Sequence, residues 1–295
     1  MPHYCTDVIS PELLQDVRPI TDDEVATFER DGVVHLIGVL NPALVAAMSE
    51  PLEAVLASPE VADLGAMVGG TGPTFVAGTD HFRTRPDFAA FACRSPLPAI
   101  AAALLRSQSV WLVEDSVLVK EPGSPHRTQF HTDLGYFHLR GAQLCTTWVP
   151  LDATGPASGM VQYLPGSHRL SHDYRPNHFV DPTPLPDTVG EVVPDILADP
   201  ALAGALITVE ALPGDVVIHH ARTIHGGPAN TSTTRRRAIS VRYGGDDVRH
   251  LRKPGVPVSR WQQAAVDGTP LADPDWPLVH SARPPRAARA SALSG

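Results

Sequence analysis

Three side chains that could bind a metal ion stand in two short stretches of this sequence. His131 and Asp133 are separated by one residue, and His225 follows far downstream. If the first pair lies on a strand, both side chains point to one face, because side chains alternate with period two. Two histidines and a carboxylate can occupy one side of a metal ion and leave its other positions open. This arrangement is typical of the facial triad that binds non-haem Fe(II).

The choice of the second histidine has rivals. A His-x-Asp triplet alone is better explained by a surface turn in which the aspartate is an N-cap. His219 and His220 stand close to His225 and offer the same imidazole ligand. His225 is preferred because two glycines follow it, and glycine lets a backbone approach a bound group closely. The arginines that come next strengthen this choice.

A run of three arginines, Arg235 to Arg237, follows His225. Such a run alone is typical of a solvated turn. On a strand, however, alternation separates Arg236 from its two neighbours, which share a face with large apolar residues. The face of Arg236 carries small and polar residues, which suits a cavity that holds a carboxylate. Arginine binds a carboxylate through two parallel hydrogen bonds, so we predict that Arg236 holds a carboxylate ligand.

Size and composition limit the possible classes of protein. A chain of 295 residues fits one barrel with appended helices. A net charge of −9 argues against a nucleic-acid partner, and three widely spaced cysteines exclude a cysteine-based zinc site. No secretory start and no apolar run of about 20 residues is found, so we expect a cytoplasmic protein with no membrane contact. We expect residues 1–282 to form a single domain and residues 283–295 a flexible tail.

The first third of the chain predicts helices with one strand. Thr21 and Glu24 form a capping-box signature for a helix that ends near Gly32, and residues 33–39 read as a strand. Asn41 and Pro42 open a further helix, whose apolar positions recur at helical spacing as far as Val55. Later, short strands separated by Gly and Pro turns predict a sandwich, barrel or jelly roll. The expected strands cover residues 111–120, 143–151, 159–163, 206–210, 215–219 and 237–243.

Two segments read as loops. Residues 65–78 are rich in Gly and Thr, but no Gly-Lys-Ser/Thr follows, so a phosphate loop is excluded. Residues 173–199 are polar and rich in proline, and a loop of this length over a barrel is often functional. We expect residues 65–85 and residues 173–199 to shape a pocket. Candidate lining residues are Phe75, His81, Phe82, Arg83, Tyr136 and Phe137.

Around these residues the sequence resembles the phytanoyl-CoA dioxygenase family, over roughly residues 21–277. The opening "FERDGVVHLIGVLNP" is similar to the family's entry into its first strand. "SVLVKEPGSPHRTQFHTDLGYF" resembles the family's approach to its His-x-Asp pair. "TTWVPLDATGPASGMVQYLPGSH" and "PGDVVIHHARTIHGGPANTSTTRRRAISVRY" resemble its later strands, with an arginine eleven residues after the distal histidine. That spacing also selects Arg236.

The resemblance implies a mainly β protein, a double-stranded β-helix (jelly-roll or cupin-like barrel) with flanking N-terminal helices. It implies Fe(II) held by His131, Asp133 and His225, with 2-oxoglutarate as cosubstrate and O2 as oxidant. Arg236 would hold the C5 carboxylate of 2-oxoglutarate. Trp148, Lys120 and Ser240 would lie near the cosubstrate, although a core tryptophan, a surface lysine and a barrel-filling serine are the alternatives.

The expected reaction is hydroxylation of an unactivated C–H bond with release of succinate and CO2. Related halogenases replace the carboxylate ligand with a small residue, so Asp133 favours oxygen chemistry, with desaturation or epoxidation as variants. The expected substrate is a small metabolite, either a natural-product intermediate or an amino-acid-like compound, bound by a monomer or homodimer. A cupin-type metal enzyme that does not use 2-oxoglutarate is the alternative, followed by a binding protein without catalysis.

Overall fold

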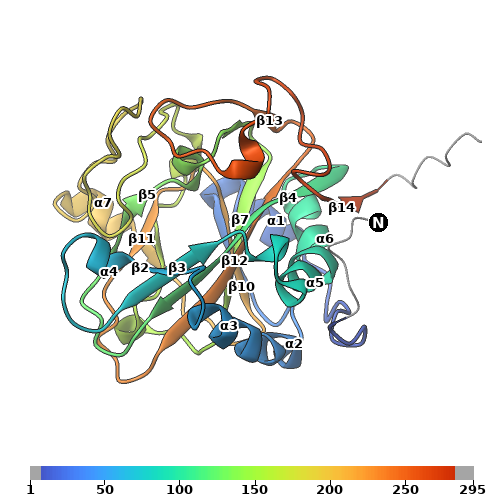
Figure 1. Cartoon of the computed structure of the whole chain (residues 1–295), viewed down its shortest axis with the longest axis horizontal. Helices are drawn as coiled ribbons and strands as arrows, with labels where there is room; N and C mark the ends of the chain where they lie inside the picture. Colours follow the sequence, from blue (N-terminus) through green and yellow to red (C-terminus); the bar gives the residue numbers. More distant parts are fainter. Residues whose placement is uncertain (1–7, 283–295) are drawn as a thin grey trace, which may run out of the picture.

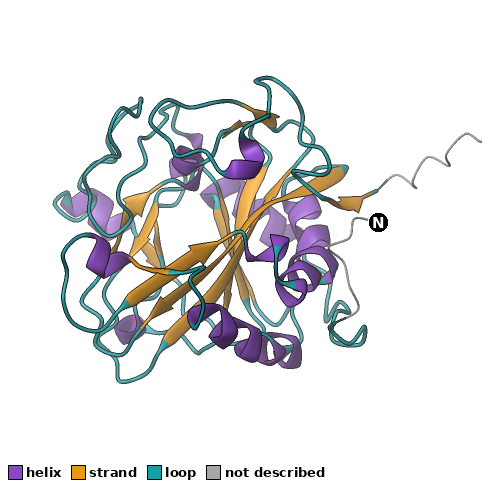
Figure 2. Cartoon of the chain, viewed as in Figure 1, coloured by secondary structure: helices purple, strands orange, loops and turns teal. Residues whose placement is uncertain are grey.

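Antiparallel strands form a barrel-like core in the computed structural model, which describes residues 8–282 (Figure 1). Helices cover one side of this core, and long loops surround its open end (Figure 2). The predicted jelly-roll fold is therefore confirmed. No helix in the described range is long and apolar enough to cross a membrane.

The larger sheet supplies one wall of the barrel. Its strands follow the order β1-β10-β7-β12-β4-β3-β2, and β14 also pairs with β4. Their bounds are β1 Val33–Leu36, β2 Ala62–Asp63, β3 Phe75–Thr79, β4 Ser109–Lys120, β7 Leu144–Pro150, β10 Val216–His220, β12 Arg236–Gly244 and β14 Leu278–Ser281. On β4 and β12, alternate side chains face the helices or the barrel interior.

The remaining strands form two smaller sheets. One has the order β5-β11-β8-β9 and carries the two predicted metal-binding histidines at its β5–β11 pair. The other is a two-stranded pair, β13-β6. Their bounds are β5 Thr128–His131, β6 Leu139–Arg140, β8 Gln162–Tyr163, β9 Ile207–Thr208, β11 His225–Gly227 and β13 Arg249–His250.

The helices pack mainly against the outer face of the larger sheet. Their apolar sides join that face in one buried cluster, which includes Leu44, Phe91 and Ile239. The α-helices are α1 Asp22–Asp31, α2 Pro42–Ala47, α3 Ser49–Leu56, α4 Leu64–Met67, α5 Pro86–Arg94, α6 Leu97–Leu104 and α7 Pro200–Ala205. The short 3-10 helices are η1 His81–Arg83, η2 Asp133–Tyr136, η3 Pro156–Ser158, η4 Ser167–Arg169 and η5 Arg260–Gln262.

The first helix begins and ends as its sequence predicts. The hydroxyl of Thr21 accepts from the Glu24 backbone N–H, and the Glu24 carboxylate accepts from the Thr21 N–H at 2.7 Å. Gly32 ends the helix with φ of 73°, a left-handed conformation that glycine adopts without steric cost. This turn feeds β1 directly into the sheet.

Two expectations for the N-terminal third are wrong. The continuous helix after Asn41 is divided at Met48 into α2 and α3, because Pro51 has no N–H to continue the helical ladder. The segment 65–78 is not a plain loop, since the described structure places most of α4 and the start of β3 in it. The Gly- and Thr-rich composition gave no sign of β3, because this strand is stabilised by pairing with β4, which lies more than 30 residues later in the sequence.

The expected strands after residue 110 are all present, with shifted ends. The last, β12, extends one residue further at each side than predicted and begins at Arg236. The expected strand over 206–210 is reduced to Ile207–Thr208, both exposed. Residues 173–199 form no helix or strand, as predicted. The expected flexible tail lies outside the described residues.

Candidate metal and cosubstrate site

The structure brings His131, Asp133 and His225 together. His131 ends β5 and faces His225 across the β5–β11 pair, while Asp133 opens the short helix η2. The Asp133 Oδ1 lies 3.5 Å from His131 Nε2 and 3.6 Å from His225 Nε2. All three residues are buried, and their ligand atoms lie within 4.8 Å of one another. Two imidazoles and a carboxylate at this spacing are a donor set that fits Fe(II).

Both histidines are oriented by the backbone. Nδ1 of His131 lies 2.7 Å from the Gln129 carbonyl oxygen, and Nδ1 of His225 lies 3.0 Å from that of Thr223. Each Nδ1–H can therefore donate, which leaves the lone pair of Nε2 for a metal. Burial, followed by the neighbouring histidines, holds the pKa of His225 well below its usual value, so this ring is neutral as a metal ligand must be.

The second oxygen of Asp133 has its own partners. The Thr146 hydroxyl donates to Oδ2, and His219 Nε2 lies 3.2 Å from the same atom. Burial alone would raise the pKa of Asp133, but His225, His131 and His219 together lower it well below its usual value. His219, a rival ligand in the sequence, thus contacts the carboxylate. His220 points elsewhere, with its Nε2 at 2.6 Å from the Ala142 carbonyl.

The glycines after His225 permit the close contact between β5 and β11. A Cβ on Gly226 would lie 2.9 Å from the Thr128 carbonyl oxygen and 3.1 Å from the Phe130 ring. Any larger residue would force the two strands apart and separate His131 from His225.

The three consecutive arginines divide as alternation predicts. Arg235 and Arg237 lie on the outer side, where both pair with Glu53, at 2.8 Å and 3.1 Å. Arg237 also binds Asp152 at 2.8 Å. Arg236 faces the barrel interior and is only 2 % exposed. Within residues 8–282 it has no carboxylate partner.

The surroundings of Arg236 fit an absent anion. Three buried donor atoms there have no hydrogen-bond partner among the described residues, namely Arg236 Nε, Trp148 Nε1 and Tyr163 Oη. Burial lowers the pKa of Arg236 to about 10, which still leaves the guanidinium charged at neutral pH. A buried charge without a partner is costly, so a carboxylate bound here would offset that cost.

Lys120 and Ser240 complete this end of the barrel interior. Lys120 is the strand neighbour of Arg236 and is fully buried, with its Nζ 2.7 Å from the Pro228 carbonyl. Burial, followed by the charge of Arg236, lowers the pKa of Lys120. Ser240 lies on the inner face of β12 opposite Trp148. The alternative of a surface lysine is therefore wrong.

Comparison with known proteins agrees with this geometry. The family model described as phytanoyl-CoA dioxygenase (PhyH) matches residues 28–238. The chain belongs to the phytanoyl-CoA dioxygenase family. This membership implies the class of non-haem Fe(II)/2-oxoglutarate-dependent oxygenases.

Individual relatives of this family member cover less of the sequence. A probable phytanoyl-CoA dioxygenase of Caenorhabditis elegans is 33% identical over 128 residues, which are 41% of this chain and 38% of that protein. The chain thus matches less than half the length of its curated relatives.

Solved structures align over a larger part of the chain. The carbocyclase SnoK from nogalamycin biosynthesis, described as non-heme and alpha-ketoglutarate-dependent, has 26% identity and a TM-score of 0.70. The alignment covers 90% of this chain and 98% of SnoK. The epimerase SnoN, solved with Fe3+, alpha-ketoglutarate (2-oxoglutarate) and nogalamycin RO, has 25% identity and a TM-score of 0.68, covering 88% and 98%.

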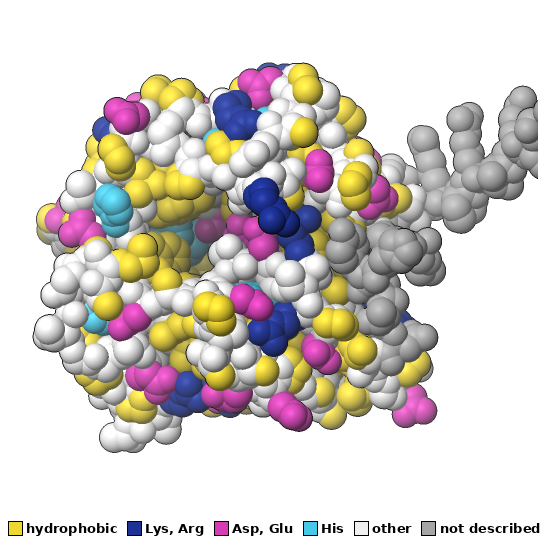
Figure 3. Space-filling model, in the orientation of Figure 1, with side chains coloured by type: hydrophobic (Ala, Val, Ile, Leu, Met, Phe, Trp, Pro, Cys, Tyr) yellow, Lys and Arg dark blue, Asp and Glu magenta, His cyan; other side chains and the backbone are white. Residues whose placement is uncertain are grey.

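A cavity of about 300 Å3 adjoins the triad of this phytanoyl-CoA dioxygenase family member. Figure 3 shows a hollow on this face, with hydrophobic side chains around it and histidine and acidic side chains deep inside. Asp133 borders the cavity, as do Tyr136 and Phe137 from the predicted lining set.

The other predicted lining residues lie elsewhere. Phe82 belongs to the core behind the sheet, and His81 packs on Phe88. Arg83 stacks on the Trp261 ring at 3.6 Å, while Phe75 packs under the Lys120 ammonium at 4.7 Å. The segment 65–85, expected to shape the pocket, thus contributes to the core as much as to the cavity.

Sequence reasoning missed several site residues. Thr146 lies two positions before Trp148 on β7, so alternation from the tryptophan could have selected it. Tyr163 stacks on the His225 ring at 5.9 Å between centroids, but nothing in the sequence singles it out from other core tyrosines. Phe179, which packs 5.0 Å from the His131 ring, comes from the long loop and carries no sequence signal.

Proposed function

We propose that His131, Asp133 and His225 bind Fe(II) and that Arg236 binds the distal carboxylate of 2-oxoglutarate. The observation that carries the proposal is the buried guanidinium of Arg236, whose Nε has no hydrogen-bond partner among the described residues. It lines the same pocket as His131, Asp133 and His225. A cupin-type metal enzyme without 2-oxoglutarate has no need of this charge. The likeness to structures described with Fe and 2-oxoglutarate supports the same reading.

Each residue has a separate task in this proposal. When bound together, Fe(II), 2-oxoglutarate and O2 supply the oxidising power that breaks a substrate C–H bond. The backbone carbonyls behind His131 and His225 fix the two imidazoles, and Thr146 and His219 fix the carboxylate. Arg236 orients the cosubstrate with its rigid fork of donors. Phe179 packs on His131 at the mouth of the site and helps to exclude water.

The reaction proposed is hydroxylation of an aliphatic carbon in a small metabolite. The carboxylate of Asp133 supports oxygen chemistry, because it fills the position that a halide would need. Carbocyclisation or epimerisation is the second candidate, favoured by the likeness to SnoK and SnoN. Turnover under isotopically labelled dioxygen separates them: hydroxylation places one labelled oxygen in the product, whereas the other two reactions leave the product unlabelled.

The proposal extends to the setting of the enzyme. A small-molecule substrate fits a cavity of about 300 Å3, and the acidic net charge of −9 suits no nucleic-acid surface. We propose a cytoplasmic monomer or homodimer, which sedimentation of the purified protein and fractionation of the source cells would test.

The decisive experiment compares Arg236→Gln with Arg235→Gln. Arg236→Gln removes the buried charge, so the affinity for 2-oxoglutarate should fall at least tenfold, in line with the ~1.5–3 kcal/mol of a hydrogen bond to a charged group. Arg235→Gln removes an outer ion pair and should leave that affinity within about twofold. Anaerobic titration of the Fe(II)-loaded protein with 2-oxoglutarate, followed by the visible charge-transfer band, measures both.

Two outcomes would contradict the proposal. Equal affinities in both variants would mean that Arg236 does not hold the cosubstrate. A wild-type protein that is folded and metal-loaded yet gives no band would favour the cupin alternative. His131→Ala tests the metal separately, because it should abolish Fe(II) retention without changing the far-ultraviolet circular dichroism.

A further inference from the structure

A second pair of charged side chains lies on the inner faces of β4 and β12, at the end of these strands away from Arg236 and Lys120. Glu114 on β4 and Arg242 on β12 are strand neighbours, and both border the cavity of about 300 Å3 next to Asp133. The Arg242 Nη1 lies 3.6 Å from the Glu114 Oε1. The proposed cosubstrate site uses Arg236 and Lys120 and assigns no role to this second pair.

Both members of the pair have unused hydrogen-bonding capacity. The Arg242 Nη1 donates to the Ser116 hydroxyl, but its buried Nε has no partner in the described part of the chain. Glu114 makes no hydrogen bond within residues 8–282, and 3.6 Å from Arg242 is longer than a hydrogen bond. Buried polar groups are almost always bonded, so the unpartnered Arg242 Nε indicates a ligand, and the Glu114 carboxylate faces the same cavity beside it.

The rest of the cavity is mostly apolar. A pocket with an apolar wall and a few convergent polar groups is the usual form of a small-molecule site. Apolar residues, among them Leu118, Phe137 and Phe179, form most of the remaining wall, and the other polar side chains there are Thr79, Ser116, Asp133, Ser259 and Gln262. The charged pair therefore marks where the polar end of a substrate lies, with an apolar body against the wall.

We propose that this cavity binds a small zwitterion of the α-amino-acid type, with its ammonium group on Glu114 and its carboxylate on Arg242. The proposal rests on the proposed function, since the metal beside Asp133 would act on the bound molecule. Because the protein charges are 3.6 Å apart, the matching charges of the ligand must lie on nearby atoms. Four charges then form a square in which each has two neighbours of opposite sign.

The electrostatics and the size of the cavity agree with this ligand. Burial, against the opposing effect of Arg242, raises the pKa of Glu114 to about 8. A bound ammonium stabilises the ionised carboxylate and gains a charged hydrogen bond. A volume of about 300 Å3 is at the lower end of ligand pockets, which suits an amino acid.

Binding of matched compounds tests the proposal. The protein is loaded anaerobically with Mn(II) and 2-oxoglutarate and titrated by calorimetry with L-leucine, N-acetyl-L-leucine, 3-methylbutylamine and 4-methylpentanoate. These probes share an apolar body and differ in their charged end. L-Leucine should bind at least tenfold more tightly than each of the other three, because only it satisfies both charges.

Two variants assign the charges. Glu114→Gln should weaken L-leucine and 3-methylbutylamine about tenfold and leave 4-methylpentanoate unchanged. Arg242→Gln should weaken L-leucine and 4-methylpentanoate and leave the amine unchanged. Glu50→Gln, the same substitution at an exposed position of α3 away from the cavity, is the control and should keep every affinity within about twofold.

The failures are distinguishable. If Mn(II) and 2-oxoglutarate bind but L-leucine binds no better than its three analogues, or not at all, the zwitterion proposal is overturned alone. The same holds if Glu114→Gln weakens all four probes equally, as a merely structural residue would. If L-leucine shows the expected preference while 2-oxoglutarate does not bind, the proposed function fails and the recognition pair stands. Circular dichroism checks that Arg242→Gln folds. If this variant does not fold, the result for Glu114→Gln decides the proposal.

Discussion

The hydroxyl of Thr146 fixes the carboxylate that is proposed to bind the metal. It donates to Asp133 Oδ2, on the side away from the two ligand histidines. Thr146→Val keeps the shape and removes the donor, so Asp133 gains freedom to rotate. We expect Mn(II) affinity to fall about 10–100-fold, which is typical when a partner of a metal ligand is lost. Titration followed by electron paramagnetic resonance measures it.

The next residue on the strand is the matched control. The Thr147 hydroxyl donates to the Val241 carbonyl, on the other face of β7. Thr147→Val should cost about 1 kcal/mol of unfolding free energy and leave Mn(II) affinity unchanged. If the two variants bind Mn(II) equally well, Thr146 does not position Asp133.

Individual residues differ in how far the sequence could predict them. Alternation along the strand, a local property, selects Arg236, and the spacing implied by the resemblance to the family selects the same residue. The contact of His219 with Asp133 was not predictable, because it depends on how β10 lies beside the start of η2. The Glu114–Arg242 pair is likewise invisible in the sequence, since the pairing of β4 with β12 creates it.

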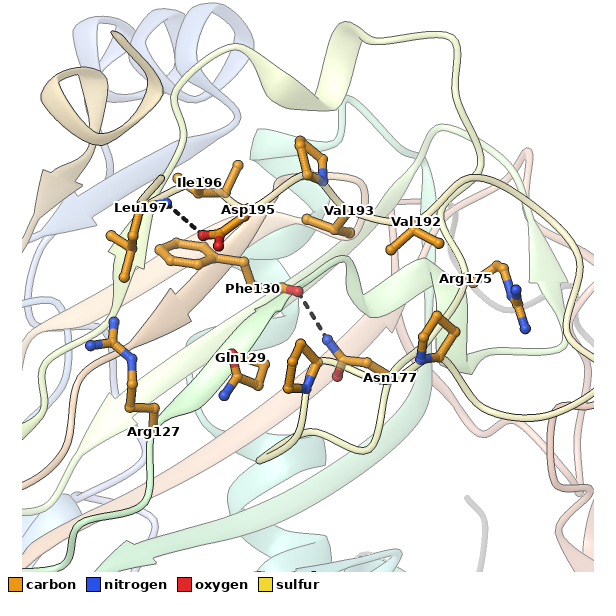
Figure 4. Close-up of a pocket in the computed structure, with 13 residues that line it drawn as sticks. Arg127, Gln129, Phe130, Arg175, Asn177, Val192, Val193, Asp195, Ile196 and Leu197 are labelled. Carbon is orange, nitrogen blue, oxygen red and sulfur yellow. Dashed lines mark hydrogen bonds between the residues drawn. The ribbon is translucent and has the colours of Figure 1, made fainter. Parts of the chain in front are cut away.

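The side chain of Asn177 is one of the contacts that hold the long segment 173–199 over β5. Asn177 Nδ2 donates to the Phe130 carbonyl at 3.0 Å (Figure 4). Its Oδ1 accepts from the Tyr136 hydroxyl at 2.8 Å. The same Oδ1 accepts from the Phe179 N–H, at a residue with a positive φ of 63°. Asn177 therefore holds Phe179 against His131.

Removing this anchor should loosen the loop. Asn177→Ala deletes both the donor and the acceptor, each worth about 1 kcal/mol. We expect hydrogen exchange over 173–199 to quicken several-fold and the apparent KM for substrate to rise. Asp181→Ala, which removes only a local exposed turn contact to Thr183, is the control. Unchanged exchange in Asn177→Ala would show that other contacts order the loop.

Among the secondary-structure elements, strong local signals were the predictable ones. The capping box of α1 and the Gly- and Pro-bounded strands after residue 110 are properties of neighbouring residues. The split between α2 and α3 was readable in principle, since Pro51 stands where the ladder needs an N–H. The strand β3 could not be predicted, because its Gly- and Thr-rich sequence forms a strand only through pairing with β4.

The helices and the barrel share one core, which leads us to propose that residues 8–282 unfold as a unit. Leu44 of α2 is fully buried in the same cluster as Ile239 of β12. Leu44→Ala should cost ~2–5 kcal/mol. All four tryptophans lie outside the N-terminal helices, at or after residue 111. Their fluorescence should nevertheless show the same lowered denaturant midpoint as circular dichroism. A fluorescence midpoint that stays at the wild-type value would divide the chain into independent domains.

The inward position of Arg236 depends on the register of β12, because alternate residues of a strand face opposite sides of the sheet. Asn230 ties the connection before β12 to the end of β4, through its Nδ2 and the carbonyls of Lys120 and Glu121. A slip of β12 by one residue along β4 and β7 would present Arg235 or Arg237 to the interior instead, and turn Ile239 and Val241 with it. Such a slip would remove the buried charge and expose core residues at once, so the apolar face of β12 protects the position of Arg236.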